Sequence, residues 1–209
     1  MKLTSTSFSD GEPIPAEYAF CMPDASTHAT LSKNINPDLA WSGLPAGTRS
    51  LALICVDHDV PSRGDDVNKE GHSVPVDLPR VDFYHWLLID LPADALPIEK
   101  GEFASGVTPK GKGGALTPRG ARQGVNDFTQ WFAADHDMSG DYFGYDGPCP
   151  PWNDELAHRY VFTLYALDID ALPVAGGFNG ADAVKAMDGH VLASASLSGL
   201  YTLNPAVEL

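Results

Sequence analysis

Two aspartates and two histidines are the residues whose types and positions suggest chemistry in this sequence. Asp57 and Asp59 follow an apolar run, and His85 and His158 lie in two other apolar segments. If the chain stays extended, the alternation of side chains places both aspartates on one face of a strand. Buried carboxylates need partners or must be protonated. The spacing therefore indicates a polar site, or else a solvated strand end in which one Asp forms a turn.

Each histidine has two interpretations. Alternation places His85 on the same face as Leu87 and Ile89, where a histidine is either a satisfied core residue or a ligand-binding one. His158 shares a face with Tyr160, directly after a proline-rich turn, and both are also consistent with a half-exposed strand entrance. Each signal is weak when taken alone.

The elements that must position these side chains are short strands. Apolar runs separated at close intervals by proline and glycine are typical of an all-β sandwich. Strands are predicted over residues 50–57, 83–91 and 158–168, which are rich in β-branched, aromatic and aliphatic residues. Every polar candidate lies on or at the end of one of these strands, where a sandwich can bring them together.

The remaining segments have less regular sequence patterns. Residues 190–203 alternate small apolar side chains with serine, which favours a strand and leaves a helix as the alternative. A short helix is predicted over residues 181–187, before an Asp-Gly stop. Residues 63–81 and 110–151 are expected to form long loops that serve as walls of a pocket.

The composition predicts a single globular domain over residues 1–209 and excludes several partners. The chain carries 13 basic and 28 acidic side chains, a formal net charge of −15. Such a charge repels nucleic acid and anionic lipid surfaces. No apolar run approaches the length of a membrane span, so stable membrane insertion is not expected.

The cysteines and the N-terminal segment favour the cytoplasm. Cys21, Cys55 and Cys149 are too few and too scattered for a disulfide framework, and a reducing compartment fits this usage. The N-terminal segment lacks the apolar core of a signal peptide. We therefore expect a cytoplasmic protein.

Several motifs, in their order and spacing, resemble the phosphatidylethanolamine-binding protein family. The blocks are DHDVPS at residues 57–62, YHW at 84–86 and GYDGPCPPWNDELAHRY at 144–160. The match is to the prokaryotic, Raf kinase inhibitor-like (YbhB/YbcL) branch. Residues 36–53 look like the N-terminal strand pair of that family, and residues 189–201 look like its C-terminal segment.

This resemblance implies a β-sandwich of two antiparallel sheets with short helices and long pocket loops. It also implies a small pocket that holds phosphate-like anions and phospholipid head groups, with no cofactor, no catalytic residue and no metal ligand. The pocket residues that it implies are Asp57, Asp59, His85, Cys149, Pro150, His158 and Tyr160.

Three features depart from the family pattern. The family usually has DPD where this chain has Asp57-His58-Asp59, and His58 is expected to point away from the two acids. Cys149 replaces another small residue, and a packed thiol is expected there rather than a reactive one. The two long loops exceed those of compact members, which affects the size of the ligand.

Two ionised carboxylates would repel a phosphate group at short range, so some of the acids and histidines in the pocket must share protons. We expect His85 and His158 to donate to a phosphate group, while Asp57 and Asp59 receive an ammonium group or fix the histidine tautomers. On this hypothesis phosphate binds more tightly as the pH falls through the histidine range. A homodimer is also expected from the resemblance.

The main rival is a metal-dependent hydrolase, because two Asp and two His are suitable ligands for zinc, manganese or iron. A serine or cysteine hydrolase lacks support, since the sequence contains no GxSxG motif. The GKGG run at residues 111–114 lacks the continuation of a phosphate-binding loop. A third possibility is a module that inhibits a kinase or a protease.

Overall fold

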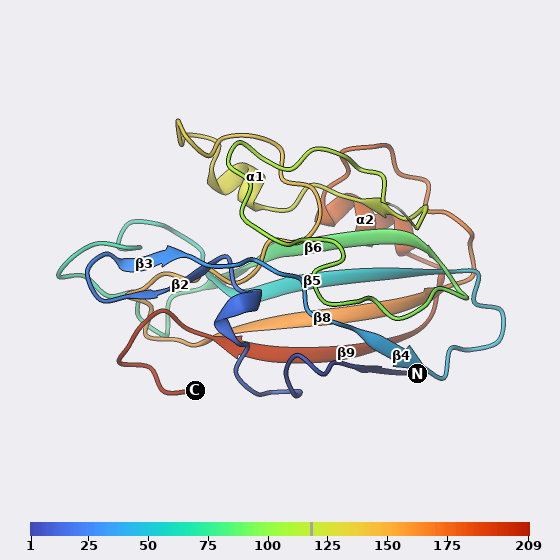
Figure 1. Cartoon of the computed structure of the whole chain (residues 1–209), viewed down its shortest axis with the longest axis horizontal. Helices are drawn as coiled ribbons and strands as arrows, with labels where there is room; N and C mark the ends of the chain where they lie inside the picture. Colours follow the sequence, from blue (N-terminus) through green and yellow to red (C-terminus); the bar gives the residue numbers. More distant parts are fainter. Residues whose placement is uncertain (118) are drawn as a thin grey trace.

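One five-stranded antiparallel sheet forms the centre of the molecule, in the order β7-β6-β5-β8-β9 (Figure 1). The computed structural model describes residues 1–117 and 119–209. The strands of the central sheet are β5 (Ser50–Pro61), β6 (Arg80–Pro92), β7 (Arg122–Gln123), β8 (His158–Leu167) and β9 (Val191–Tyr201).

Short elements surround this sheet. Two small antiparallel pairs join β1 to β4 and β2 to β3, and the helices are brief. Their bounds are β1 (Lys2–Thr4), η1 (Ala16–Tyr18), β2 (Cys21–Asp24), β3 (His28–Leu31), β4 (Ala40–Ser42), α1 (Phe128–Trp131) and α2 (Gly180–Met187). The all-β prediction is confirmed.

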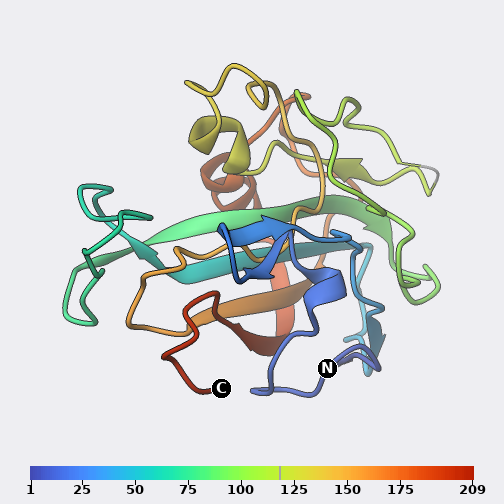
Figure 2. The ribbon, with the colours of Figure 1, turned by 60° about the vertical axis from the view of Figure 1, so that its left-hand side comes forward.

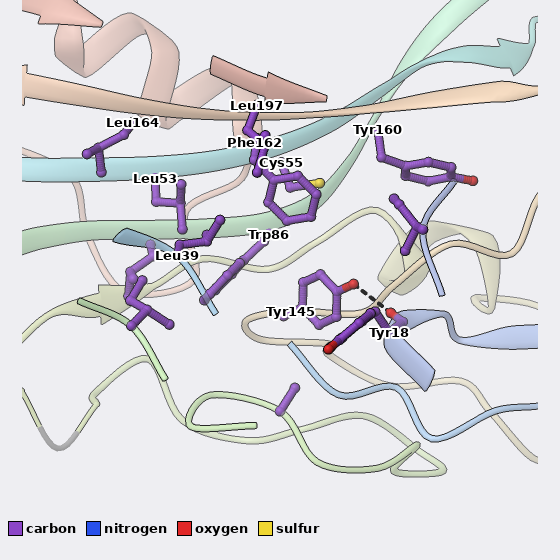
Figure 3. Packing of buried hydrophobic residues seen from close by; sticks show 14 of the residues in the cluster. Tyr18, Leu39, Leu53, Cys55, Trp86, Tyr145, Tyr160, Phe162, Leu164 and Leu197 are labelled. Carbon is purple, nitrogen blue, oxygen red and sulfur yellow. Dashed lines mark hydrogen bonds between the residues drawn. The ribbon is translucent and has the colours of Figure 1, made fainter. Parts of the chain in front are cut away.

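Side chains alternate between the two faces of the central sheet, and both faces are buried along most of β5 and in the middle of β6. In β5, Leu51, Leu53 and Cys55 enter a large core that also contains residues of β1, β2 and the long loops (Figure 3). Ala52 and Ile54 point the other way, into a small core covered by α2. Burial on both faces explains why β5 is an almost continuous apolar run.

The predicted strands over residues 50–57, 83–91 and 158–168 are all present. The predicted strand over residues 190–203 is present as β9 (Val191–Tyr201), and no helix forms there. The predicted short helix corresponds to α2, which begins with a capping box between Asn179 and Asp182. The long stretch over residues 110–151 contains β7 and α1 within its loops.

The cysteines differ from the prediction. Cys21 of β2 and Cys149 form a disulfide, so Cys149 is not a packed free thiol. The two residues are 128 positions apart in sequence, and only the fold brings β2 against the loop that contains Cys149. Disulfides persist in oxidising environments, so the cysteines no longer favour a reducing compartment. Cys55 is a buried free cysteine.

The helices are short throughout the part of the chain that the structure describes. None of them has the length and apolar character needed to cross a membrane.

Candidate functional site

A pocket lies at the end of the central sheet where β5, β6 and β8 run side by side. In β5, Asp57 lies opposite Tyr160 of β8 and opposite Phe83 of β6. His158 precedes Tyr160 by two residues and therefore shares its face. Six of the seven predicted site residues line this one pocket: Asp57, His85, Cys149, Pro150, His158 and Tyr160. Their role in binding a ligand stays a prediction.

A β-bulge turns His85 into the pocket. Cys55 lies opposite Trp86, and Val56 lies opposite Tyr84, so that His85 is the extra residue on β6. A bulge of this kind interrupts the regular alternation and redirects a side chain.

The bulge also corrects the predicted face of His85. Leu87 and Ile89 lie in the small core beneath α2, on the opposite side of the sheet. The His85 ring instead packs against Phe128 and Tyr160, with ring centroids 5.5 and 5.0 Å apart. The prediction assumed an unbroken period of two, which the bulge removes.

A second irregularity separates Asp59 from the pocket. The pairing of β5 with β6 shifts between Asp57 and Val60, so Asp57 and Asp59 do not share one face. The Asp59 carboxylate accepts a hydrogen bond from the backbone N–H of Arg159 at 2.8 Å, and Asp59 does not line the pocket. His58 is exposed and contacts Asp82, as expected for a side chain that points away from the pocket.

His158 is held between two carboxylates and is fully buried. Its Nδ1 atom lies 2.7 Å from Asp57 Oδ2, and its Nε2 atom lies 3.1 Å from Asp154 Oδ2. Burial by itself lowers the pKa of His158, but the hydrogen bonds to Asp154 and Asp57 outweigh it and raise the pKa to about 9. His158 is therefore a cation at neutral pH, and both of its ring nitrogens are engaged.

Arg80 completes a network of four charges. Its guanidinium donates to both carboxylate oxygens of Asp154, at 2.6 and 3.0 Å. Burial raises the pKa of Asp154, but the hydrogen bonds from His158 and Arg80 hold it below the ordinary value. Asp57, His158, Asp154 and Arg80 together form an alternating set of charges that is neutral overall.

The sequence analysis assigned no role to Asp154 or Arg80. Asp154 lies four residues before His158, and this spacing is the one local signal that relates the two. Arg80 lies at the start of β6, far from both in sequence, and only the fold places it here.

His85 is neutral and has a defined tautomer. Its Nδ1 atom lies 2.8 Å from the backbone oxygen of Asp146, which can only accept, so Nδ1 carries the proton. Burial lowers the pKa of His85, although the Asp57 carboxylate opposes this shift. The Nε2 atom thus presents an unprotonated lone pair at neutral pH, and His85 lines the pocket.

The Tyr160 hydroxyl is buried and makes no hydrogen bond of good geometry, although, besides burial, the nearby Asp57 carboxylate contributes to its raised pKa. Among the described residues it is the one buried side-chain oxygen or nitrogen with no hydrogen-bond partner. Figure 3 shows the Tyr160 ring at one end of the large core, with its oxygen directed away from Phe162. Burial raises the pKa of Tyr160 well above its ordinary value, so the hydroxyl keeps its proton. Buried polar groups are rarely left unpaired, and this one is available to a ligand.

Most of the remaining wall is apolar. The cavity has a volume of about 90 Å³. One water needs about 10–15 Å³ by the same measure, so the cavity holds a group the size of a small oxyanion. Its apolar lining includes Val60, Pro61, Phe83, Phe128, Trp131 and Pro151. Trp131 is 53% exposed, so its aromatic ring lies at the mouth of the pocket.

The loop that carries Cys149 is anchored by a buried aspartate. Asp146 accepts hydrogen bonds from Asn34 at 2.6 Å and Asn126 at 2.8 Å, and Lys112 lies 3.0 Å away. Burial raises the pKa of Asp146, with Lys112 and the two amides opposing this shift. This anchor also fixes the backbone carbonyl of Asp146, which accepts the hydrogen bond from His85 Nδ1.

The opposite loop, residues 62–79, is held by Asn153. The Asn153 amide donates to the backbone oxygens of Asp66 at 2.8 Å and His72 at 3.0 Å, and its own oxygen accepts from the N–H of Asn68 at 2.9 Å. Figure 2 shows this connection between β5 and β6 extending beyond the end of the sheet. Gly64, Val67 and Asn68 line the pocket from this side.

The four residues first identified do not converge as metal ligands. Within residues 1–117 and 119–209, no group of three or more His, Cys, Asp or Glu side chains is arranged to hold a metal ion. His158 can offer a lone pair to a metal only if it gives up a carboxylate partner.

Comparison with known proteins gives a consistent result. Residues 4–202 match the family model described as phosphatidylethanolamine-binding protein. A UPF0098 protein of Methanothermobacter thermautotrophicus is 35% identical over 96% of this chain and 98% of its own. UPF0098 protein YbhB of Escherichia coli is 31% identical over 97% of this chain and 100% of its own.

Solved structures agree with this match. The crystal structure of Escherichia coli YbcL superposes with a TM-score of 0.67 and 25% identity, covering 96% of this chain and 97% of that one. A Chlamydia trachomatis homologue superposes with a TM-score of 0.64 and 29% identity, covering 96% of this chain and 95% of that one. The chain therefore belongs to the phosphatidylethanolamine-binding protein family.

Proposed function

We propose that the pocket binds a phosphate monoester, such as the head group phosphorylethanolamine, without chemical turnover. The observation that carries this proposal is the buried Tyr160 hydroxyl, which has no partner and lies beside His85. A phosphate oxygen that accepts from Tyr160 would satisfy this donor. Membership of the family, whose name refers to such a lipid, supports the same ligand class.

The charge network removes the objection that an acidic pocket repels an anion. Both oxygens of Asp57 are engaged, one by His158 and the other by the backbone N–H of Asp59 at 2.8 Å. The His158 cation compensates the Asp57 charge. We therefore assign donation at neutral pH to Tyr160, and to His85 only after it gains its second proton, and not to His158 as first expected.

The donor and acceptor pattern favours a ligand that carries one proton. At neutral pH, Tyr160 offers a proton and His85 Nε2 offers a lone pair. A singly protonated phosphate monoester complements both, because it has an oxygen acceptor and an O–H donor. An ammonium group attached to it would lie at the aromatic mouth beside Trp131, where cation–π attraction is available.

The pH dependence follows from His85. Burial lowers its pKa, so the imidazole gains its second proton below about pH 6.5, the ordinary value for histidine. A phosphate monoester also takes up a proton near pH 6. Both effects add a proton to the site, and we expect affinity to rise as the pH falls from 8 to 5.5.

The test is an NMR titration with phosphorylethanolamine at pH 5.5 and pH 8, for the wild type and for Tyr160→Phe. Loss of one hydrogen bond to a charged ligand should weaken binding about tenfold or more. The variant should fold with little change in stability, because the hydroxyl makes no hydrogen bond of good geometry in the protein.

The matched control is Tyr142→Phe. The Tyr142 hydroxyl donates to the backbone oxygen of Met138 at 2.6 Å, so its loss should reduce stability and leave affinity unchanged. Equal affinity of the wild type and Tyr160→Phe would overturn the proposal, as would an affinity that does not change between the two pH values.

Other expectations remain proposals of ours. We propose a homodimer, which light scattering at dilute concentration would test. The cytoplasm stays our expectation for the location, although the Cys21–Cys149 disulfide is of a kind that persists in oxidising environments, and cell fractionation would test it. Inhibition of a kinase or protease has no specific residue in its favour among those that the structure describes.

A further inference from the structure

The β2–β3 hairpin is a small element that a disulfide bonds to the loop in the pocket wall. Of the residues in these two described strands, only Cys21 is buried. The hairpin forms a two-stranded sheet of its own. An isolated two-stranded hairpin is marginally stable in water. The bond from Cys21 to Cys149 is the covalent attachment of this hairpin to the pocket loop, and the Tyr201 hydroxyl also donates to the backbone oxygen of Cys21 at 2.8 Å.

The base of the hairpin is attached to the pocket wall. The N–H groups of Phe20 and Cys21 both donate to the backbone oxygen of Pro148, at 2.9 and 3.1 Å. The disulfide joins the neighbouring residue, Cys149, which lines the pocket together with Pro150. Any displacement of Cys21 is thus transmitted directly to the wall.

The tip of the hairpin contacts both loops that close the pocket. The ring of His28 stacks on Trp152, with centroids 3.9 Å apart, and Trp152 follows the proline pair of the pocket loop. Nε2 of His28 also lies 2.6 Å from a carboxylate oxygen of Glu70, in the loop over residues 62–79. One hairpin therefore links the two loops.

We propose that the Cys21–Cys149 disulfide is a thiol–disulfide exchange site in the pocket wall, and that its reduction by a dithiol releases the hairpin and loosens the pocket. The effect on ligand affinity rests on the phosphate-binding function proposed above. The release of the hairpin does not depend on that function.

The two bonded cysteines differ in the exposure of their residues. Cys149 is half-buried and lines the pocket, whereas Cys21 is 9% exposed. A thiolate of the dithiol attacks Cys149 Sγ, forms a mixed disulfide and expels the Cys21 thiolate, which takes up a proton. The second thiol of the reductant then closes its own disulfide and releases Cys149 as a thiolate that also takes up a proton. The protein disulfide is reduced, and the dithiol is oxidised to a cyclic disulfide.

Reduction should have a local effect, because the central sheet does not depend on this bond. Strand β8 is paired on both sides, with β5 and β9, so this strand, which carries both His158 and Tyr160, should stay in place. The hairpin would then separate from Trp152 and Glu70, and the pocket would lose the fixed spacing of its loops.

Hydrogen exchange is the direct test, run on the full chain before and after treatment with dithiothreitol under native conditions. We expect faster amide exchange in residues 20–31 and 66–72 after reduction, with β5 and β8 unchanged. We also expect the affinity for phosphorylethanolamine to fall about fivefold or more, a typical size for coupling between two sites. The double variant Cys21→Ser/Cys149→Ser should match the reduced protein and should not respond to dithiothreitol.

The control is Cys55→Ala, which removes the buried free cysteine and should leave the response to dithiothreitol intact. If the double variant does not fold, the comparison of oxidised and reduced wild type is sufficient. A disulfide that native dithiothreitol does not reduce, or exchange that is the same in both states, overturns the proposal. Faster exchange with unchanged affinity overturns the link to the pocket. If the oxidised protein does not bind phosphorylethanolamine, only the proposed function is contradicted. Hydrogen exchange then still tests whether reduction releases the hairpin.

Discussion

One wall of the pocket is carried by three neighbouring strands, and the other is carried by loops. The strand wall contains Asp57, His85, His158 and Tyr160, whose backbones are fixed by pairing within the sheet. The loop wall, residues 62–79 and 144–153, is fixed by isolated side chains and one disulfide. The polar groups that we expect to meet the ligand therefore lie on the rigid side.

This difference indicates how the two walls should respond to change. A buried charge network on strands cannot relax, so the loss of one member leaves another charge unpaired. A loop that loses one tether can move without disturbing the sheet. Damage to the strand wall should appear as global instability, and damage to the loop wall should appear as local motion.

The largest effect is expected from His158→Ala. This change leaves Asp57 without its cationic partner and removes one partner from Asp154, both of them buried. Breaking a buried charge pair costs about 3–5 kcal/mol, and we expect a loss of that size in the free energy of unfolding.

Urea denaturation measures the effect of His158→Ala, with His58→Ala as the control. His58 is half-exposed and contacts one exposed carboxylate, so its loss should cost no more than about 1 kcal/mol. Similar losses for the two variants would contradict a rigid strand wall.

The next effect is a dependence of stability on pH. The pKa of His158 is about 9 in the folded protein and about 6.5 in the unfolded chain. A raised pKa contributes stability that is complete below pH 6.5 and is lost as the pH rises through 9. We expect the free energy of unfolding to fall over this window by up to about 3 kcal/mol.

Denaturation at pH 6.5, 8 and 9 tests this expectation, and His158→Gln provides the reference. The variant should show a clearly weaker dependence over the same window, because its side chain does not titrate. A parallel decline in both proteins would mean that other groups determine the effect.

The smallest global effect is expected from Asn153→Ala on the loop wall. The Asn153 side chain satisfies several backbone groups of residues 66–72, and leaving such groups unpaired costs about 1–3 kcal/mol. We expect fast hydrogen exchange in residues 66–72 with little change in β5 and β8.

Asn204→Ala is the matched control for this loop, because Asn204 donates instead to the backbone oxygen of Asp154. Its loss should leave exchange in residues 66–72 unchanged. Equal acceleration of exchange in the loop and in the central strands, after Asn153→Ala, would show that the two walls are not independent.

The main strands and the helix near residue 181 were predictable because local patterns specify them. Alternation and β-branched content mark β5, β6 and β8, and helix formers before Asp188-Gly189 mark α2. The same rules misplaced His85 and Asp59. A bulge depends on how one strand meets another, and this is not encoded in the period of either strand.

The residues that hold the pocket residues in place were less predictable than the pocket residues themselves. Six of the seven expected residues share the pocket, but Asp154 and Arg80 were missed, and Cys149 was expected to be unpaired. Nothing in the local sequence around Arg80 distinguishes it from a solvated charge.

The sequence by itself determined the strands, the family and most of the pocket residues, because these depend on short-range patterns and motifs. Only the tertiary structure decided that His158 is enclosed by two carboxylates, that Tyr160 lacks a partner and that Cys21 is bonded to Cys149. The physical reason is that hydrogen bonds, charge pairs and disulfides form between atoms that are close in space. Cys21 and Cys149, 128 positions apart, become neighbours only when the strands pair and the loops close over them.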